Sequence, residues 1–293
     1  MVLPSAFAEA RGRAVALARR TAFHLGGRPE FLFEPEDAEE ARQVLRQCRL
    51  RDVVVRVLGG GSNLLVGDRP LAGAVVATRQ LRGIEVGPND VVVGAGEPLP
   101  GLVRRAASLG IAGLAACAGI PGSVGGAVAM NAGGQDGTIS RSLVWVEGVS
   151  AEGRLFHREV GDGDFGYRES VFDRTLLTRV AFRRDPGLDA DAERRRLRRV
   201  LARKQATQPL GARCAGCIFR NPDRGPAAGR LIEDAGLKGR RIGDAVVSSR
   251  HANFIVNVGS ATARDVRALI RLVREEVRRR SGIELELEVR VWV

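Results

Sequence analysis

The stretch that decides the fold is Ala118-Gly119-Ile120-Pro121-Gly122-Ser123-Val124-Gly125-Gly126-Ala127-Val128-Ala129-Met130-Asn131-Ala132-Gly133-Gly134. It is too apolar for a surface loop, and its glycine content predicts neither a helix nor a strand. Glycine tolerates positive φ and lets another group approach the backbone closely. The clustered glycines therefore indicate a bound ligand rather than a core of side chains.

A second glycine loop, Gly59-Gly60-Gly61-Ser62-Asn63, directly follows the strand-like run Val53–Leu58. Two loops of bare backbone amides, one of them after a strand, suit an anionic diphosphate that N–H groups must hold. A pair of tight turns is the alternative interpretation. Neither loop fits G-x-G-x-x-G or G-x-x-x-x-G-K-[ST], so an ordinary Rossmann site or P-loop is not indicated.

The length of 293 residues predicts two or three domains with ample core. No apolar run reaches the roughly 18 residues of a membrane span, and the N-terminus lacks an apolar segment followed by a cleavage site. We therefore expect a soluble, unexported protein. Four cysteines in a chain of this length do not form a disulfide framework, which fits a reducing compartment.

The net charge of +12 permits a nucleic-acid-binding protein. Much of the arginine, however, lies in helical runs such as 194–199 and 274–280, where a solvated helix face is the simpler interpretation. One Tyr, two Trp and ten Phe supply few base-stacking surfaces. A positive field would attract phosphorylated small molecules equally well, so the charge alone decides nothing.

Hydrophobic periodicity predicts the remaining elements. Helices are expected at 5–20, 37–50, 99–109, 189–204, 227–235 and 263–280, and strands at 53–58, 91–94, 143–149, 155–160, 176–182, 254–258 and 283–292. The last helix opens on a capping box, Thr262-Ala263-Arg264-Asp265, and stops at Gly282. The break at 183–187, followed by a strongly charged helix, predicts a domain boundary.

The final predicted strand places three carboxylates on one face, Glu284, Glu286 and Glu288. They repel each other unless they are spread into solvent or given a partner. Glu284 is predicted to face solvent. One of the inner pair could meet a partner or substrate, and periodicity does not choose between Glu286 and Glu288.

Two further segments contain reactive residue types. Arg168 lies between aromatic residues in Phe165-Gly166-Tyr167-Arg168-Glu169-Ser170-Val171-Phe172, and arginine suits a planar carboxylate or phosphate, although a surface arginine is the simpler interpretation. Cys214-Ala215-Gly216-Cys217 matches C-x-x-C. A zinc site lacks a second ligand pair at useful spacing, and the sequence after Cys217 does not resemble the helix that follows a thioredoxin-type dithiol. We expect no metal.

An ordered series of motifs resembles the UDP-N-acetylenolpyruvoylglucosamine reductase (MurB) family, in its compact type II form. The motifs are Thr21-x-Phe23…Gly26-Gly27, Leu58-Gly59-Gly60-Gly61-Ser62-Asn63-Leu64-Leu65, the 118–133 stretch, Gly166-Tyr167-Arg168-x-Ser170-x-Phe172, Gln208-Pro209-Leu210, Ala215-Gly216-Cys217-x-Phe219-x-Asn221-Pro222, Ala228-Gly229-x-Leu231-Ile232-Glu233, Ser249-x-His251-Ala252-Asn253-Phe254-Ile255-Val256-Asn257 and Glu288-Val289-Arg290.

The resemblance implies an α+β fold: an FAD-binding PCMH-type (vanillyl-alcohol-oxidase-like) α/β fold of two subdomains, plus a C-terminal α+β substrate domain. The expected boundaries are 1–57 and 58–187 for the FAD-binding subdomains, the second with the glycine-rich loops, and 188–293 for the substrate-binding domain.

The resemblance also implies a cytoplasmic enzyme of peptidoglycan precursor synthesis, in which NADPH reduces FAD. UDP-N-acetylglucosamine enolpyruvate then takes a hydride from flavin N5 at C3 and a proton at C2, giving UDP-N-acetylmuramate. We expect a monomer that binds no nucleic acid and does not insert into a membrane.

Carried over residue by residue, the resemblance assigns catalysis to Arg168, Cys217 and Glu288, and so chooses Glu288 over Glu286. The expected FAD-binding residues are Leu58, Gly59, Gly60, Gly61, Ser62, Asn63, Leu64, Gly119, Ile120, Pro121, Gly122, Ser123, Gly125, Gly126, Asn131 and Ala132. The expected substrate-binding residues are Tyr167, Arg203, Lys204, Arg220, Asn221 and His251.

The expected proton donor departs from the family pattern, since most members carry serine where this chain has Cys217. A thiol, with a reference pKa of about 8.5, is a stronger acid than a hydroxyl and delivers a proton only while it is protonated. Our hypothesis is that Cys217 donates to C2 as the neutral thiol.

The rival enzyme class is an oxidase of the same flavin superfamily, which would pass electrons to oxygen.

Overall fold

The computed structural model describes residues 4–161 and 163–293, which divide between two compact units. The first unit draws its described residues from Met1–Ala14, Glu30–Gly60 and Ala72–Lys204, and the second from Val15–Pro29, Gly61–Leu71 and Gln205–Val293. Neither unit is one continuous run of chain. The glycine loop predicted at 59–63 is shared between them, since Gly60 ends a segment of the first unit and Gly61 begins one of the second.

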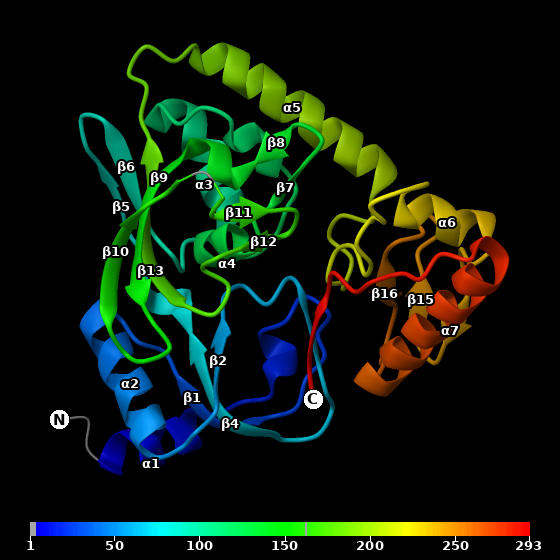
Figure 1. Cartoon of the computed structure of the whole chain (residues 1–293), viewed down its shortest axis with the longest axis horizontal. Coiled ribbons are helices and arrows are strands. Elements are labelled where there is room, and N and C mark those ends of the chain that lie inside the picture. Colours follow the sequence, from blue (N-terminus) through cyan, green and yellow to red (C-terminus); the bar gives the residue numbers. More distant parts are fainter. Residues whose placement is uncertain (1–3, 162) are drawn as a thin grey trace. The chain divides into compact units, whose positions relative to one another are not determined.

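The first unit contains two sheets (Figure 1). The three-stranded sheet has the order β1 (Pro29–Phe33), β4 (Leu71–Ala77), β2 (Val55–Leu58), with β2 parallel to β4. The five-stranded antiparallel sheet has the order β10 (Leu155–Glu159), β9 (Leu143–Val149), β13 (Leu176–Arg183), β6 (Asp90–Gly94), β5 (Ile84–Val86). Two short hairpins complete the strands: β7 (Gly133–Gly134) with β8 (Gly137–Thr138), and β11 (Phe165–Gly166) with β12 (Glu169–Ser170).

The helices of this unit are α1 (Pro4–Arg13), α2 (Ala38–Leu50), α3 (Leu99–Arg105), α4 (Val124–Ala129) and α5 (Ala190–Thr207), whose last turn runs into the second unit. α2 begins where Asp37 accepts a hydrogen bond of 2.7 Å from the Glu40 amide, as an N-cap does. Its apolar face packs in one core with β4 and with the ends of β9 and β13. A second core lies between the five-stranded sheet, α3 and α4.

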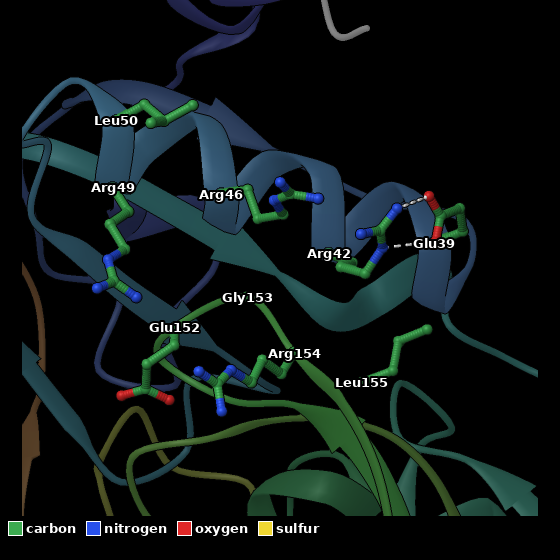
Figure 2. Close-up of a pocket in the computed structure, with 9 residues that line it drawn as sticks. All are labelled: Glu39, Arg42, Arg46, Arg49, Leu50, Glu152, Gly153, Arg154 and Leu155. Atoms are coloured by element: carbon green, nitrogen blue, oxygen red, sulfur yellow. Dashed lines mark hydrogen bonds and ion pairs between the residues drawn. The ribbon is translucent and has the colours of Figure 1, made fainter.

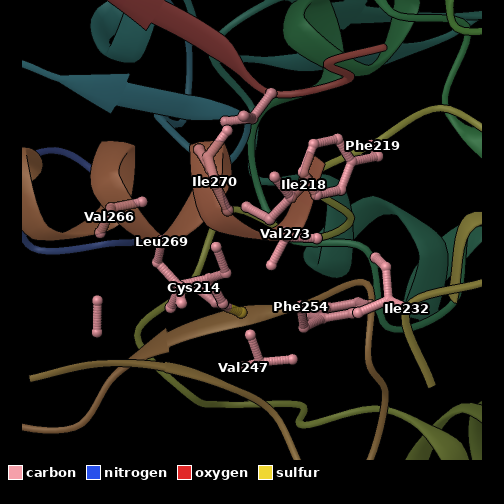
Figure 3. Packing of buried hydrophobic residues seen from close by; sticks show 14 of the residues in the cluster. Cys214, Ile218, Phe219, Ile232, Val247, Phe254, Val266, Leu269, Ile270 and Val273 are labelled. Carbon is pink, nitrogen blue, oxygen red and sulfur yellow. The ribbon is translucent and has the colours of Figure 1, made fainter. Parts of the chain in front are cut away.

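The second unit is built on α7 (Ala263–Ser281). Both hydrogen bonds of the predicted Thr262–Asp265 capping box are present, and Gly282 ends the helix at φ +71°. α7 packs its apolar face into the core drawn in Figure 3, together with Ile218, Phe219 and Phe254. Each such buried side chain contributes about 1.5–3 kcal/mol. The other elements are α6 (Ala228–Asp234), the sheet β14 (Arg241–Ile242), β15 (Ala245–Val247), β16 (Ile255–Asn257), and the parallel pair β3 (Leu64–Val66) and β17 (Arg290–Trp292).

Most of the predicted elements are confirmed within a few residues at each end. The helix predicted at 99–109 is α3 followed by a 3-10 turn, Ala106–Leu109, and it ends at Gly110 in the left-handed region. The strand β4 was not predicted, because it is almost uniformly apolar and shows no alternation. None of the helices in the described part of the chain has the length and apolar character that a membrane crossing requires.

The prediction that the long glycine stretch contains no helix is wrong, because Val124–Ala129 forms α4. Ser123 caps this helix by accepting from the Gly126 amide at 3.3 Å, and Val124 and Val128 are fully buried. Gly125 is required by packing: a β-carbon there would lie 2.8 Å from Ala95 Cβ. Capping and burial thus override the low helix propensity of glycine.

Two further predictions are wrong at the chain ends. The helix predicted over 5–20 stops at Arg13, because the amides of Leu17 and Ala18 bond instead to the carbonyls of Gly27 and Gly26. The strand predicted over 283–292 is regular only in β17. Before it, the Glu288 and Val289 amides both bond to the Ile218 carbonyl, so the pairing is irregular and Leu287 is 36% exposed.

Candidate active site

In the first unit the two glycine loops pack directly against each other. A β-carbon at Gly60 would lie 2.4 Å from Gly122 Cα, and one at Gly59 would lie 2.5 Å from Ser123 Oγ. Real β-carbons do not approach backbone so closely, so position 60 accepts only glycine, whereas a β-carbon at position 59 would require the Ser123 hydroxyl to move. The 119–126 loop is held in turn by hydrogen bonds from the Val124 amide to the Glu97 carbonyl and from the Leu99 amide to the Gly122 carbonyl, both 2.9 Å. The loops form one glycine cradle, defined here as 59–60 and 119–126.

Asn131 supplies an unsatisfied buried polar atom near the end of α4. It is 6% exposed at φ +41°, and its amide nitrogen donates to the Gly166 carbonyl at 2.9 Å. Its buried Oδ1 has no hydrogen-bond partner among the described residues. A buried acceptor of this kind is costly unless a bound group donates to it. The imide N–H of an isoalloxazine ring is such a donor, so the cradle and Asn131 together fit FAD.

The glycine packing gives a prediction about cofactor retention. We expect Gly60→Ala to raise the Kd for FAD about tenfold or more, because the new methyl group forces the two loops apart. Titration of the deflavinated protein with FAD, followed by flavin fluorescence, measures the effect. Gly134→Ala is the matched control, since nothing lies within 4 Å of its added β-carbon. Equal FAD affinity in both variants and the wild type would contradict the fit.

Arg168 lies at the tip of the β11–β12 hairpin in the left-handed region, φ +61°, with its guanidinium 5.4 Å from the centre of the Tyr167 ring. Two hydrogen bonds of 2.9 Å fasten this hairpin to the end of α4: Ser170 Oγ donates to the Ala129 carbonyl, and Asn131 donates to Gly166. The segment that carries the orphaned Asn131 oxygen therefore also positions Arg168.

Lys204 and Arg203 already have partners inside the first unit. The Lys204 ammonium is buried and donates to the Ala118 carbonyl at 2.7 Å, at the start of the glycine stretch. Burial lowers the pKa of Lys204 from its ordinary value, and the nearby Arg168 charge lowers it further. Arg203 forms an ion pair with Asp136. The Lys204 ammonium thus stabilises the backbone at the start of the glycine stretch, and it lies close enough to Arg168 for the two positive charges to interact.

In the second unit the segment Cys217–Phe219 lies between two others. On one side Cys217 bridges Phe254, and on the other Phe219 bridges Leu287. The Glu288 amide donates to the Ile218 carbonyl at 2.9 Å, and the Glu288 carbonyl accepts from Asn63 Nδ2 at 3.1 Å. Cys217 and Glu288 therefore lie on neighbouring segments, and Asn63 of the 59–63 loop is bonded to Glu288.

The side chain of Asn253 fixes this segment, a role that sequence reasoning missed. Its Oδ1 accepts from the Phe219 amide at 2.9 Å and its Nδ2 donates to the Phe219 carbonyl at 2.8 Å, both buried. The residue stands in the motif Ser249-x-His251-Ala252-Asn253, but a pattern does not reveal that an asparagine substitutes for a strand partner.

Removing this clamp should cost stability. We expect Asn253→Ala to lower the free energy of unfolding by about 2–5 kcal/mol, because it leaves the buried amide and carbonyl of Phe219 unpaired. Urea unfolding followed by circular dichroism measures the change. The control Asn89→Ala, at an exposed position, should stay within about 0.5 kcal/mol of the wild type. A loss no larger than that of the control would show that Asn253 is dispensable.

The other predicted substrate residues of the second unit have defined surroundings. Asn221 Oδ1 accepts from the Ala228 amide at 3.1 Å and so caps the start of α6. His251 Nδ1 accepts from the Asn253 amide at 3.3 Å, and its ring meets Phe254 edge-on. Burial lowers the pKa of His251, with the Lys238 charge adding to the effect, which favours neutral imidazole near pH 7. Arg220 is anchored through its amide to the Glu286 carbonyl at 2.9 Å.

The two cysteines of the C-x-x-C sequence have unlike environments. Cys214 is a free thiol in the core, where burial raises its pKa above the ordinary value (Figure 3). Cys217, by contrast, is only partly buried. A thiol inside an apolar core is inert as a nucleophile. The C-x-x-C match therefore contains one cysteine that packs in the core, Cys214, and one that solvent partly reaches, Cys217.

Comparison with known proteins identifies both parts of the chain. Residues 29–158 match the family model described as FAD binding domain, and residues 208–292 match the C-terminal domain of UDP-N-acetylenolpyruvoylglucosamine reductase. The chain is therefore an FAD-binding oxidoreductase with a PCMH-type domain, as the family resemblance implied.

The full-length relatives narrow this class to one family. The chain is 43% identical to UDP-N-acetylenolpyruvoylglucosamine reductase from Synechococcus sp. (strain CC9311), covering 94% of this chain and 91% of that protein, and the Moorella thermoacetica enzyme gives the same values. The crystal structure of MurB from Thermus caldophilus superposes with a TM-score of 0.79 at 37% identity, over 96% of this chain and 98% of that one. The chain belongs to the UDP-N-acetylenolpyruvoylglucosamine reductase family, in its compact form. It is an oxidoreductase of peptidoglycan precursor synthesis that uses FAD and NADPH.

Proposed function

We propose that this chain reduces UDP-N-acetylglucosamine enolpyruvate to UDP-N-acetylmuramate by means of Arg168, Cys217 and Glu288. FAD, when bound and reduced by NADPH, would supply a hydride from its N5 atom to C3 of the enolpyruvyl group. The residues of this chain supply placement, charge and the proton. The observation that carries the proposal is the hydrogen bond from the Glu288 amide to the Ile218 carbonyl, which sets a carboxyl group on the segment beside the partly exposed Cys217 thiol.

Arg168 binds the substrate carboxylate through its planar guanidinium and stabilises the negative charge that develops as the double bond is reduced. Support comes from the hairpin, because Ser170 and Asn131 fix the backbone on both sides of Arg168. Glu288 is proposed to act together with Arg168, by hydrogen bonding to the enolpyruvyl carboxylate and polarising it.

Cys217 delivers the proton to C2 from its neutral thiol. Its neighbours Ile218 and Phe219 are fully buried, and Asn253 holds the Phe219 backbone. The thiol therefore lies on a rigid segment. A general acid must be held in a fixed position in order to transfer its proton to one particular carbon atom.

Binding of the nucleotide sugar is proposed for Tyr167, Arg203, Lys204, Arg220, Asn221 and His251. The FAD diphosphate and ring are proposed to lie on Leu58, Gly59, Gly60, Gly61, Ser62, Asn63, Leu64, Gly119, Ile120, Pro121, Gly122, Ser123, Gly125, Gly126, Asn131 and Ala132. We further propose a cytoplasmic monomer with FAD-binding subdomains at 1–57 and 58–187 and a substrate-binding domain at 188–293.

The role of Arg168 is tested by separating the two half-reactions. We expect Arg168→Lys to reduce flavin with NADPH at nearly the wild-type rate, and to be reoxidised by the enolpyruvyl sugar about 10²-fold more slowly, because an ammonium lacks the paired donors of a guanidinium. Anaerobic stopped-flow absorbance of the flavin resolves both steps. Wild-type rates in both, or slowing confined to the NADPH step, would remove Arg168 from the proposed role.

A further inference from the structure

A concave groove of about 590 Å³ lies on the first unit, between α2 and the turn that joins β9 to β10 (Figure 2). It is lined by Glu39, Arg42, Arg46, Arg49, Leu50, Glu152, Gly153, Arg154 and Leu155. None of these residues belongs to the glycine cradle, to the Arg168 hairpin or to the segments around Cys217. Its volume lies within the range of small-molecule sites, about 300–1,000 Å³.

The groove carries arginines on both walls. Arg42, Arg46 and Arg49 follow one another at helical spacing and so share one face of α2. Figure 2 shows Arg49 directed from the helix toward the turn that carries Glu152 and Arg154. Arg42 is held by hydrogen bonds to Glu39. Within residues 4–161 and 163–293, the guanidinium groups of Arg46, Arg49 and Arg154 have no ion-pair partner within 4 Å.

The turn that forms the facing wall is fixed by its own contacts. Gly153 is buried at φ +75°, and a β-carbon there would lie 2.5 Å from Arg46 Cγ, so the turn backbone rests on the stem of that arginine. Ser150 Oγ accepts from the amides of Glu152 and Arg154 and donates to Glu152 Oε2 at 2.7 Å. Arg154 is thus presented from a built turn rather than from a free loop.

The charges in the groove leave a positive excess. Four arginines and two glutamates line it, a formal excess of two. The Ser150 hydrogen bond, with the nearby Arg49 and Arg154 charges, lowers the pKa of Glu152, so its carboxylate is ionised at neutral pH and is already counted. Guanidinium groups bind phosphate oxygens in paired fashion. An anion with two or three negative charges and several oxygens matches this arrangement in charge and donor type.

We propose that the groove between α2 and the β9–β10 turn binds a diphosphate group, free or as part of a nucleotide, through Arg46, Arg49 and Arg154. Its concave shape favours a compact ligand over an extended nucleic acid or acidic polypeptide, which would need a longer basic surface. The site lies outside the proposed catalytic residues, so its occupancy is separable from turnover.

Isothermal titration of the holoenzyme with inorganic pyrophosphate tests the proposal. The double variant R46Q/R154Q should lose one binding event seen in the wild type, or bind there at least about tenfold more weakly, while NADPH oxidation with the enolpyruvyl sugar stays unchanged. Glutamine keeps the Arg46 stem that packs on Gly153. The matched control R267Q/R271Q removes the same charge from an exposed face of α7 and should bind as the wild type does.

Two further arms identify the ligand. UDP bound more tightly than pyrophosphate, with the difference lost in R46Q/R154Q, assigns the site to a nucleotide; equal or weaker binding assigns it to the free diphosphate. An unchanged pyrophosphate titration in R46Q/R154Q overturns the proposal. So does equal weakening in R267Q/R271Q, which indicates a diffuse charge effect, or binding of oligoglutamate but not pyrophosphate.

Discussion

Cys217→Ala is expected to lower kcat for reduction of the enolpyruvyl sugar by about 10²–10⁴-fold, the usual contribution of a positioned general acid. The change removes the proposed proton donor to C2 but leaves in place the backbone bonds that hold the neighbouring residues, from the Ile218 amide to Asn253 and from the Glu288 amide to Ile218. Flavin reduction by NADPH should persist. Steady-state NADPH oxidation, with product quantified by chromatography, measures the loss.

Two serine variants sharpen this prediction. Cys217→Ser keeps a hydroxyl where most of the family carries serine, so it should retain substantial turnover. Cys214→Ser tests a dithiol mechanism and should also retain activity, at some cost in stability, since Cys214 packs in the core. Equal activity in the wild type, Cys217→Ser and Cys217→Ala would remove Cys217 from the mechanism. Loss of sugar reduction in Cys214→Ser would indicate a redox pair instead.

Glu288→Ala is expected to lower kcat by about 10²–10³-fold with a smaller change in KM, because the lost interaction is strongest when negative charge develops on the substrate. The backbone of Glu288 keeps its bonds to Ile218 and Asn63, so the fold of the segment should survive. Glu288→Gln retains a weaker N–H donor and should fall between the alanine variant and the wild type. Steady-state kinetics of sugar-dependent NADPH oxidation separates the three.

Glu286→Ala is the matched control for this series. Glu286 is exposed, and its backbone carbonyl accepts a hydrogen bond from the Arg220 amide. The alternation of apolar and charged residues in the sequence did not distinguish Glu286 from Glu288 as the functional carboxylate. Near wild-type kcat in Glu286→Ala, beside the loss in Glu288→Ala, confirms the choice. The reverse order of effects would transfer the role to Glu286.

Local patterns predicted the parts of this fold that depend on nearby residues. The 263–280 helix has a periodic apolar face, a capping box and a terminal glycine, and all three are found in α7. The glycine loops were recognised from composition alone. What composition could not tell was that Gly60 and Gly122 are glycines because the two loops touch. That reason depends on residues far apart in the chain.

The errors have the same origin. α4 forms inside a glycine-rich stretch because Ser123 and two buried valines stabilise it. The 283–292 segment loses its regular pairing because the Ile218 carbonyl accepts hydrogen bonds from two successive amides. For the site, Arg168, Cys217 and Glu288 came from a family resemblance rather than from residue chemistry. Asn253 was missed because its structural role consists of two hydrogen bonds to the Phe219 backbone, and the spacing of residues in the sequence does not predict such a contact.

The most direct test mixes purified, NADPH-reduced holoenzyme with UDP-N-acetylglucosamine enolpyruvate in the absence of oxygen. The yellow absorbance of oxidised flavin is predicted to return at once, with one molecule of UDP-N-acetylmuramate formed per flavin. A flavin that stays bleached until oxygen is admitted would contradict the assignment and identify an oxidase.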